Sequence, residues 1–213
     1  MKRIFILLPV LFLNCKIGYT QSSSFKEGDN TISAGYGWGN YEPYVLNLDP
    51  HNHQSPTTTI TTTTGPIYLK YDYAHSNIMS WGVDVAYAQF NLTNPVTISN
   101  FSRYYTGTST YHEHETYTTC SVLFRWNWHF SNGSKFDPYG GLGLGFKYGA
   151  FNYSTDAPIN EYYYFDSNRS SVFPLGFETT IGARYYFTDF LALYCETGLA
   201  KSAIQFGATF KIR

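Results

Sequence analysis

The chain has 213 residues, which suits one domain, and its formal net charge is −1 at pH 7. Charged residues make up only 14% of it and aromatic residues 20%, whereas soluble domains are usually about 25% charged. So few charges would leave a water-exposed surface poorly solvated, while abundant Tyr suits a membrane boundary. No basic field is available, so nucleic-acid binding is excluded.

Residues 1–20 are predicted to be a secretory signal peptide. The first three residues carry two positive charges, and the apolar segment 4–13 that follows is too short to span a bilayer as a helix. A lipoprotein cysteine at Cys15 is the alternative, although Leu and Asn stand where small residues should precede it. Residues 21–213 would then form the mature domain.

Apolar and polar residues alternate with a period of two from Thr31 to the end of the chain, which indicates half-buried strands rather than helices. Most of the alternating segments approach the length that a tilted transmembrane strand needs. In chain order, the eight predicted strands are 31–39, 66–73, 81–91, 117–130, 138–151, 172–187, 191–199 and 204–213.

The connections between these strands alternate in length. Long polar connections are expected at 40–65, 92–116 and 152–171, and short ones at 74–80, 131–137 and 188–190. The last connection, 200–202, breaks the pattern because it is short on the outer side. Such alternation is typical of a barrel with long extracellular loops and short periplasmic turns. The fold class predicted is therefore all-β, an eight-stranded antiparallel up-and-down transmembrane β-barrel.

Charged residues within the predicted strands all lie on the face opposite to the large apolar residues. Alternation alone does not fix which face meets water, but the apolar set, with all four Trp, is too bulky for an eight-stranded lumen. The charged face is also rich in Gly, which a crowded lumen favours, and its charges balance. The predicted lumen network comprises Lys70, Asp72, Asp84, Arg125, Lys147, Glu178, Arg184 and Glu196.

Strand direction predicts which of these charges pair. Lys147, Glu178 and Glu196 lie at similar heights on three consecutive strands, and Asp84 and Arg125 do so on the third and fourth. Buried ions persist only when they are paired. We therefore expect ion pairs that plug the lumen and fix the strand register.

The chain resembles the small outer-membrane β-barrel family of the OmpA and OmpX type, often labelled porin-like. The resemblance rests on the leader, on the segment Pro138 to Gly145, and on the closing segment Ala203 to Phe210. It implies a location in the outer membrane of a Gram-negative envelope, contact with outer-membrane lipid, and insertion by the barrel assembly machinery as a monomer. The family usually ends in an aromatic residue, whereas this chain ends Phe210-Lys211-Ile212-Arg213.

Two His-x-His pairs lie in the predicted long loops: His51 and His53 in the first, and His112 and His114 in the second. Four imidazoles with nearby carboxylates could hold zinc or copper. The alternative is that all four are solvated loop residues. No cofactor is otherwise expected.

No enzyme activity and no catalytic residues are expected. His129-Phe130-Ser131 resembles an acyl-hydrolase pair, but it would lie at the periplasmic turn, away from outer-leaflet lipid, and His129 would point into the lumen. The predicted function is structural or surface recognition, with a surface ligand bound at the extracellular loops. The alternatives are a narrow passive channel and, behind it, a secreted soluble β-barrel binding protein.

Overall fold

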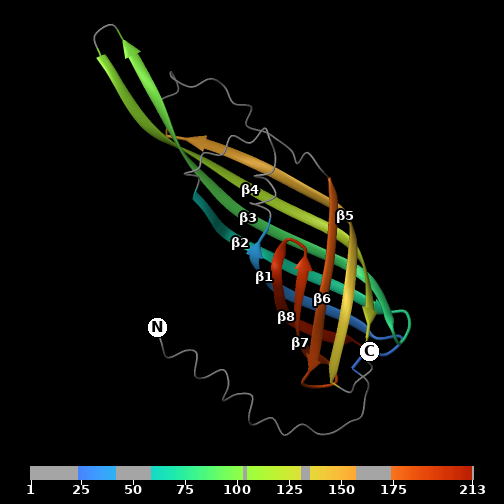
Figure 1. Cartoon of the computed structure of the whole chain (residues 1–213). Coiled ribbons are helices and arrows are strands. Elements are labelled where there is room, and N and C mark those ends of the chain that lie inside the picture. The colour runs from blue at the N-terminus through green and yellow to red at the C-terminus, as the bar shows by residue number, and fades with distance from the viewer. Residues whose placement is uncertain (1–23, 42–58, 103–104, 131–134, 157–173, 213) are drawn as a thin grey trace, which may run out of the picture.

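The computed structural model describes residues 24–41, 59–102, 105–130, 135–156 and 174–212 (Figure 1). Eight antiparallel strands follow one another around a closed barrel, in which β1 pairs with both β2 and β8. The strands are β1 Asn30–Asn40, β2 Thr59–Ala74, β3 Met79–Ser102, β4 Tyr105–His129, β5 Phe136–Thr155, β6 Leu175–Tyr186, β7 Leu191–Leu199 and β8 Ser202–Ile212. The predicted up-and-down barrel is confirmed. The predicted signal peptide lies outside the described residues.

In the described part of the chain, no helix is long and apolar enough to cross a membrane.

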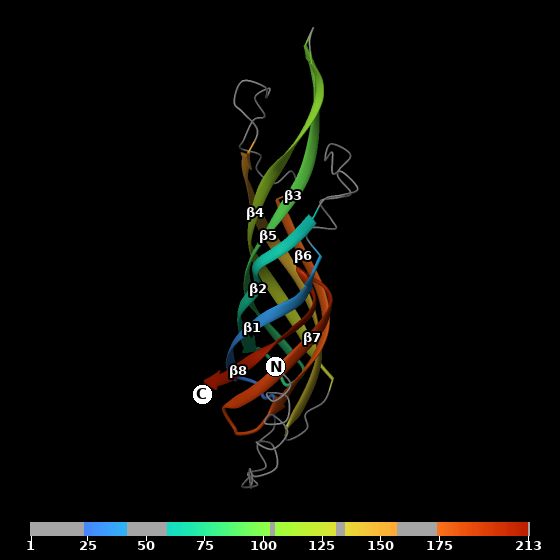
Figure 2. The ribbon, with the colours of Figure 1, turned by 90° about the vertical axis from the view of Figure 1, so that its left-hand side faces the viewer.

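The barrel has two different ends. The short turns after β2, β4 and β6 lie at the end where β1 begins and β8 finishes, which we call the turn end. The other end, which we call the hairpin end, carries the connection between β3 and β4 (Figure 2).

β3 and β4 are much longer than the sequence predicted. The segment 92–116 was expected to be a loop, but it forms a hairpin whose pairs run in register from Thr93 and His114 to Ser102 and Tyr105. The segment is polar, which suggested a loop. It is also rich in Thr and Tyr, which favour the strand conformation, and each strand supplies the other's hydrogen bonds. Residues 59–65 of the expected loop 40–65 belong to β2, and residues 152–155 of the expected loop 152–171 belong to β5.

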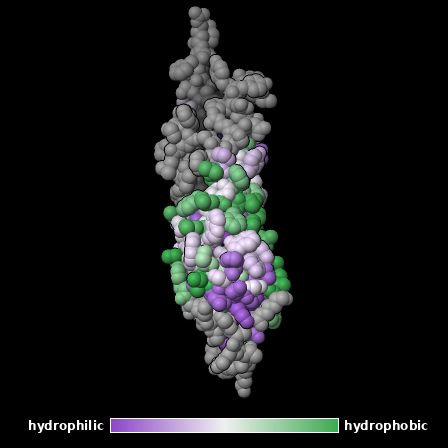
Figure 3. All heavy atoms as spheres, turned by 90° about the vertical axis from the view of Figure 1, so that its right-hand side faces the viewer, coloured by the Kyte–Doolittle hydropathy of each residue, from purple (hydrophilic) through white to green (hydrophobic). Residues whose placement is uncertain are grey.

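The barrel wall is inverted relative to a soluble protein. Phe124, Trp126 and Phe206 face outward with 36%, 38% and 50% of their surface exposed, whereas Arg184 and Glu196 are each 1% exposed in the lumen. Apolar residues gather around the barrel wall (Figure 3). This arrangement confirms the predicted assignment of the two strand faces.

Aromatic side chains form two rows on the outer face. Tyr73, Trp81 and Trp126 are register neighbours on β2, β3 and β4 near the turn end. Nearer the hairpin end, Tyr87 and Tyr148 flank Cys120 in the same way. From the Cys120 position to Trp126 is about 20 Å along the strand at about 3.3 Å per residue. Such paired rows are the pattern of aromatic girdles that flank an apolar band.

Glycine on the lumen face makes room for long side chains. A Cβ atom on Gly35 would lie 2.1 Å from Tyr194 Oη, and one on Gly143 would lie 2.6 Å from Glu178 Cγ. Cβ atoms cannot approach this closely, so these positions require glycine. The core of the molecule is therefore the lumen itself, filled by side chains from all around the wall.

Candidate functional site

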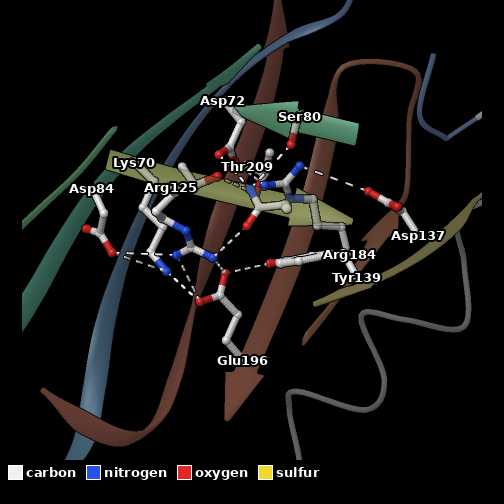
Figure 4. Close-up of polar contacts among 12 residues, drawn as sticks. Lys70, Asp72, Ser80, Asp84, Arg125, Asp137, Tyr139, Arg184, Glu196 and Thr209 are labelled. Atoms are coloured by element: carbon white, nitrogen blue, oxygen red, sulfur yellow. Dashed lines mark hydrogen bonds and ion pairs between the residues drawn. The ribbon is translucent and has the colours of Figure 1, made fainter. Parts of the chain in front are cut away.

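The charged network predicted from the sequence lies in the middle of the lumen (Figure 4). Seven of its eight members are buried: Lys70, Asp72, Asp84, Arg125, Glu178, Arg184 and Glu196. Lys147 is half-buried. The alternation of each strand turns these side chains inward, and the closed wall keeps water away from them.

Glu196 of β7 is the centre of the first group. It accepts hydrogen bonds from Lys70 Nζ at 2.6 Å and from both terminal nitrogens of Arg125 at 3.2 Å. Tyr139 Oη donates a further hydrogen bond at 2.7 Å. The planar guanidinium of Arg125 matches both carboxylate oxygens, which is the stronger, bidentate form of such a contact.

Asp84 and Glu178 complete this group. Arg125 Nη1 lies 3.0 Å from Glu178 Oε1 and 3.6 Å from Asp84 Oδ2, and Lys70 Nζ lies 3.7 Å from Asp84 Oδ2. The structure thus brings together Asp84 and Arg125, as the sequence predicted. Three carboxylates surround two cations in this group.

Glu196 pairs with Lys70 and Arg125 rather than with Lys147, and Glu178 pairs with Arg125. Lys147 and Glu178 instead line one pocket near the hairpin end. The sequence argument compared heights on consecutive strands only. In a narrow closed barrel, long side chains reach across the lumen, so partners also come from strands that are not neighbours.

A second group lies closer to the turn end. Arg184 of β6 pairs with Asp72 of β2 and approaches Asp137 at 4.0 Å. Asn127 Nδ2 donates a hydrogen bond to Asp72 Oδ1 at 2.9 Å. The Arg184 guanidinium also lies 4.7 Å from the Tyr139 ring centroid, within range of a cation–π contact. The sequence argument missed Asp137, Asn127 and Tyr139 because it placed Asp137 in a turn and followed only charged residues.

His129 of β4 links two further polar residues. Its Nδ1 lies 2.6 Å from Asp137 Oδ1, and its Nε2 lies 3.1 Å from Ser80 Oγ. His129 points into the lumen, as expected, while Ser131 lies outside the described residues. The Ser80–His129–Asp137 order is that of a hydrolase triad, but all three side chains are buried, and the Phe25 ring stacks on the imidazole at 3.4 Å. Phe25 therefore covers one face of the imidazole.

Residues 24–29 fill the turn end of the lumen. Lys211 Nζ donates hydrogen bonds to Ser24 O at 2.6 Å and to Asp29 Oδ2 at 2.9 Å, which ties this segment to β8. Gly28 N donates to Ala74 O, which ties it to β2. The segment carries Phe25 into the barrel, where its side chain is buried.

The hairpin end of the lumen has an apolar cluster. Phe90 and Leu92 of β3 and Tyr117 of β4 are buried, and Phe151 packs against them. The ring centroids of Tyr117 and Phe151 are 4.4 Å apart. The sequence argument did not predict this cluster. It lies at the hairpin end of the predicted strands 81–91, 117–130 and 138–151, and only Leu92 falls outside them.

The β3–β4 hairpin extends beyond the barrel as a two-stranded ribbon (Figures 1 and 2). Within the described residues, β2 pairs with β3 only as far as Thr93, and β5 pairs with β4 only from Glu113. Residues 94–102 and 105–111 therefore pair only with each other there. Nine residues of strand extend for about 30 Å.

His112 and His114 lie on one face at the base of this ribbon, with ring centroids 6.4 Å apart. Asp156 faces His112: its Oδ1 accepts a hydrogen bond from His112 N at 2.6 Å, and Oδ2 lies 3.4 Å from His112 Nδ1. The backbone N–H of His112 holds the pKa of Asp156 below its ordinary value.

The other predicted metal ligands, His51 and His53, lie outside the described residues. Among the residues that are described, no three His, Cys, Asp or Glu side chains gather as a metal site would require. The four-histidine site stays a prediction.

No protein-family model and no curated protein matches the chain. Among solved structures, it is similar to the outer membrane protein OprG of Pseudomonas aeruginosa, at 16% identity and a TM-score of 0.43, over 92% of this chain and 100% of that one. It is also similar to Ail, the attachment invasion locus protein of Yersinia pestis, solved with the heparin analogue sucrose octasulfate. The identity is 16% and the TM-score 0.40, over 87% of this chain and 95% of that one. The N-terminal β-barrel domain of Pseudomonas aeruginosa OprF gives 13% identity, TM-score 0.39, and 88% and 99% covered. At such identities the likeness concerns the barrel alone.

Proposed function

We propose that the chain is an outer-membrane barrel with a closed lumen, which recognises a surface ligand through the β3–β4 ribbon. The observation that supports this most strongly is the combination of an apolar outer wall with an open-edged ribbon whose strand segments 94–102 and 105–111 carry no charged residue. Export by the N-terminal signal and insertion as a monomer by the barrel assembly machinery belong to the same proposal.

The outer wall favours lipid as its surroundings. In water, a contiguous band of Leu, Val, Phe and Trp side chains around the whole barrel would drive aggregation. In a bilayer, the same band is solvated by lipid tails, and a closed barrel leaves no backbone group unpaired at its edges. A secreted soluble barrel would need the reverse arrangement of its two faces.

The ribbon supports a role in recognition. Exposed strand edges attract other strands, and proteins usually protect them with charges, especially Lys, or with Pro. Residues 94–102 and 105–111 contain no Asp, Glu, Lys or Arg, and Pro95 is their single proline. A two-stranded ribbon is also marginally stable in water. A partner that adds an extended segment to either edge would satisfy its backbone groups.

Shortening the ribbon tests this role. Replacing residues 94–113 with Asn-Gly joins Thr93 to His114, which are already register partners, by a favoured two-residue turn. We expect the barrel to fold, since the change removes only the outermost β4–β5 pair, Glu113 with Thr155, and the contact of His112 with Asp156. Adhesion of cells expressing the variant to matrix-protein-coated surfaces should fall to the level of cells lacking the chain.

Thr97→Lys and Thr97→Val form the matched pair for this experiment. Thr97 is exposed and opposite Thr110, so lysine adds charge to the ribbon while valine keeps its strand preference. The lysine variant should adhere less than the valine variant. Adhesion that survives both the shortening and the lysine variant would rule out the ribbon as the recognition element.

A narrow passive channel is the alternative function, and the contents of the lumen disfavour it. An ion would have to pass the Phe90–Tyr117 cluster, the network around Glu196, and Phe25 stacked on His129. We expect no discrete conductance steps when the purified chain is reconstituted in planar bilayers. Steps that scale with the amount of inserted protein would support the channel instead.

A further inference from the structure

A pocket of about 230 Å³ lies in the lumen near the hairpin end. The wall is uneven there, because β5 continues to Thr155 whereas β6 begins only at Leu175. At the low side, Tyr41 N donates a hydrogen bond to Lys201 O at 2.9 Å and joins the end of β1 to the β7–β8 turn. The lining includes Tyr41, Tyr68, Ser121, Lys147, Glu178 and Lys201.

Two lysines reach this pocket from different parts of the wall. Lys201 extends from the β7–β8 turn to β4, where its Nζ donates a hydrogen bond to Thr119 Oγ1 at 2.6 Å. Lys147 of β5 is the register partner of Ser121, the next lumen-facing residue on β4 after Thr119. Lys147 and Thr119 are therefore diagonal neighbours on β5 and β4, and such neighbours are about 7–8 Å apart. The backbone of Lys147 and the ammonium end of Lys201 thus lie at adjacent positions of the wall.

The floor of the pocket differs in chemistry from its walls. Glu178 lies there with Oε1 3.0 Å from Arg125 Nη1, so its charge is directed into the ion network. Tyr68 lies beside it and hydrogen-bonds Ser202 Oγ at 2.9 Å. Tyr41 is partly exposed at the rim. The pocket therefore combines two ammonium groups with one carboxylate, which Arg125 already binds, and with apolar side chains and two tyrosines. Each tyrosine offers an apolar ring and a polar tip.

We propose that this pocket binds a small phosphate-bearing ligand, no larger than a monosaccharide phosphate. Ammonium groups on flexible stems bind phosphate as point charges, and the tyrosines can contact a sugar ring. The pocket volume of about 230 Å³ limits the ligand to a small molecule of this kind. The proposal does not depend on the role of the ribbon.

Calorimetry on the purified full chain in detergent micelles tests the site, with glucose 6-phosphate, glucose and inorganic phosphate as probes. We expect saturable binding of glucose 6-phosphate, tighter than that of either fragment. Lys147→Gln and Lys201→Gln should each weaken it about tenfold, because each removes one charged contact. Lys135→Gln, which removes the same charge at the turn end of the barrel, should leave Kd unchanged.

Heat-dependent electrophoretic mobility confirms that each variant is folded. The proposal fails if glucose 6-phosphate shows no saturable binding to the folded wild-type chain. It also fails if the Lys147→Gln/Lys201→Gln double variant binds as tightly as Lys135→Gln. Inorganic phosphate binding as tightly as glucose 6-phosphate would show that the pocket does not recognise the sugar.

Discussion

Val122→Arg is expected to destabilise the barrel by about 2–4 kcal/mol, the cost of a cationic side chain near the bilayer midplane on the lipid face of such a barrel. Val122 lies on the outer face of β4, half-exposed, with Val85 and Phe146 as its register partners. It stands between the row of Tyr87 and Tyr148 and the row of Tyr73, Trp81 and Trp126. The free energy of unfolding by denaturant in lipid vesicles measures the effect.

Thr118→Arg is the matched control for this prediction. Thr118 lies on the same strand and on the same face, but beyond Cys120 and its flanking tyrosines, toward the hairpin end. There the arginine can reach headgroups and water, so the cost should fall to about 0–1 kcal/mol. Equal effects at the two positions would show that the outer face has no apolar midplane, and the membrane proposal would then be wrong.

The barrel could be predicted because one physical rule acts on every strand. Alternation in segments such as 172–187 and 204–213 assigns a face to each residue, and the charges then test that assignment. The rule works where the two faces meet different surroundings, lipid and lumen. It weakens along the ribbon, which leaves the barrel wall and no longer separates lipid from lumen, and the sequence argument accordingly mistook a hairpin for a loop.

The members of the ion network could be predicted, but only some of their partners. Asp84 and Arg125 lie on neighbouring strands, so strand direction brings them together. The Lys70–Glu196 pair joins β2 to β7 across the lumen, and this contact depends on the shear and closure of the barrel, which no single segment encodes. Neutral participants such as Tyr139 have no charge pattern to reveal them.

The removal of Arg125 is expected to have the second large effect. Arg125→Met keeps most of the side-chain volume but leaves Asp84 and Glu196 with Lys70 alone and removes the contact between Arg125 and Glu178. Breaking a buried ion pair by removing one partner costs about 3–5 kcal/mol, because the remaining charges are desolvated without compensation. Chemical unfolding in vesicles gives the value, and Lys147→Met, which removes a half-buried cation from the same lumen face, should cost much less.

A double-mutant cycle combines Arg125→Met with Glu196→Gln. It separates the effect of the net charge in this group from the effect of the direct contact between the two residues. In this group three carboxylates surround two cations, so neutralising Glu196 relieves an excess of negative charge, whereas removing Arg125 increases it. Glu196→Gln alone should therefore cost less than Arg125→Met alone. The double variant should cost less than the sum by about 0.5–3 kcal/mol, since both residues belong to one network. If the two effects simply add, Arg125 and Glu196 do not stabilise the barrel through each other. If Glu196→Gln is the costlier change, the group does not carry the excess of negative charge that this argument assumes.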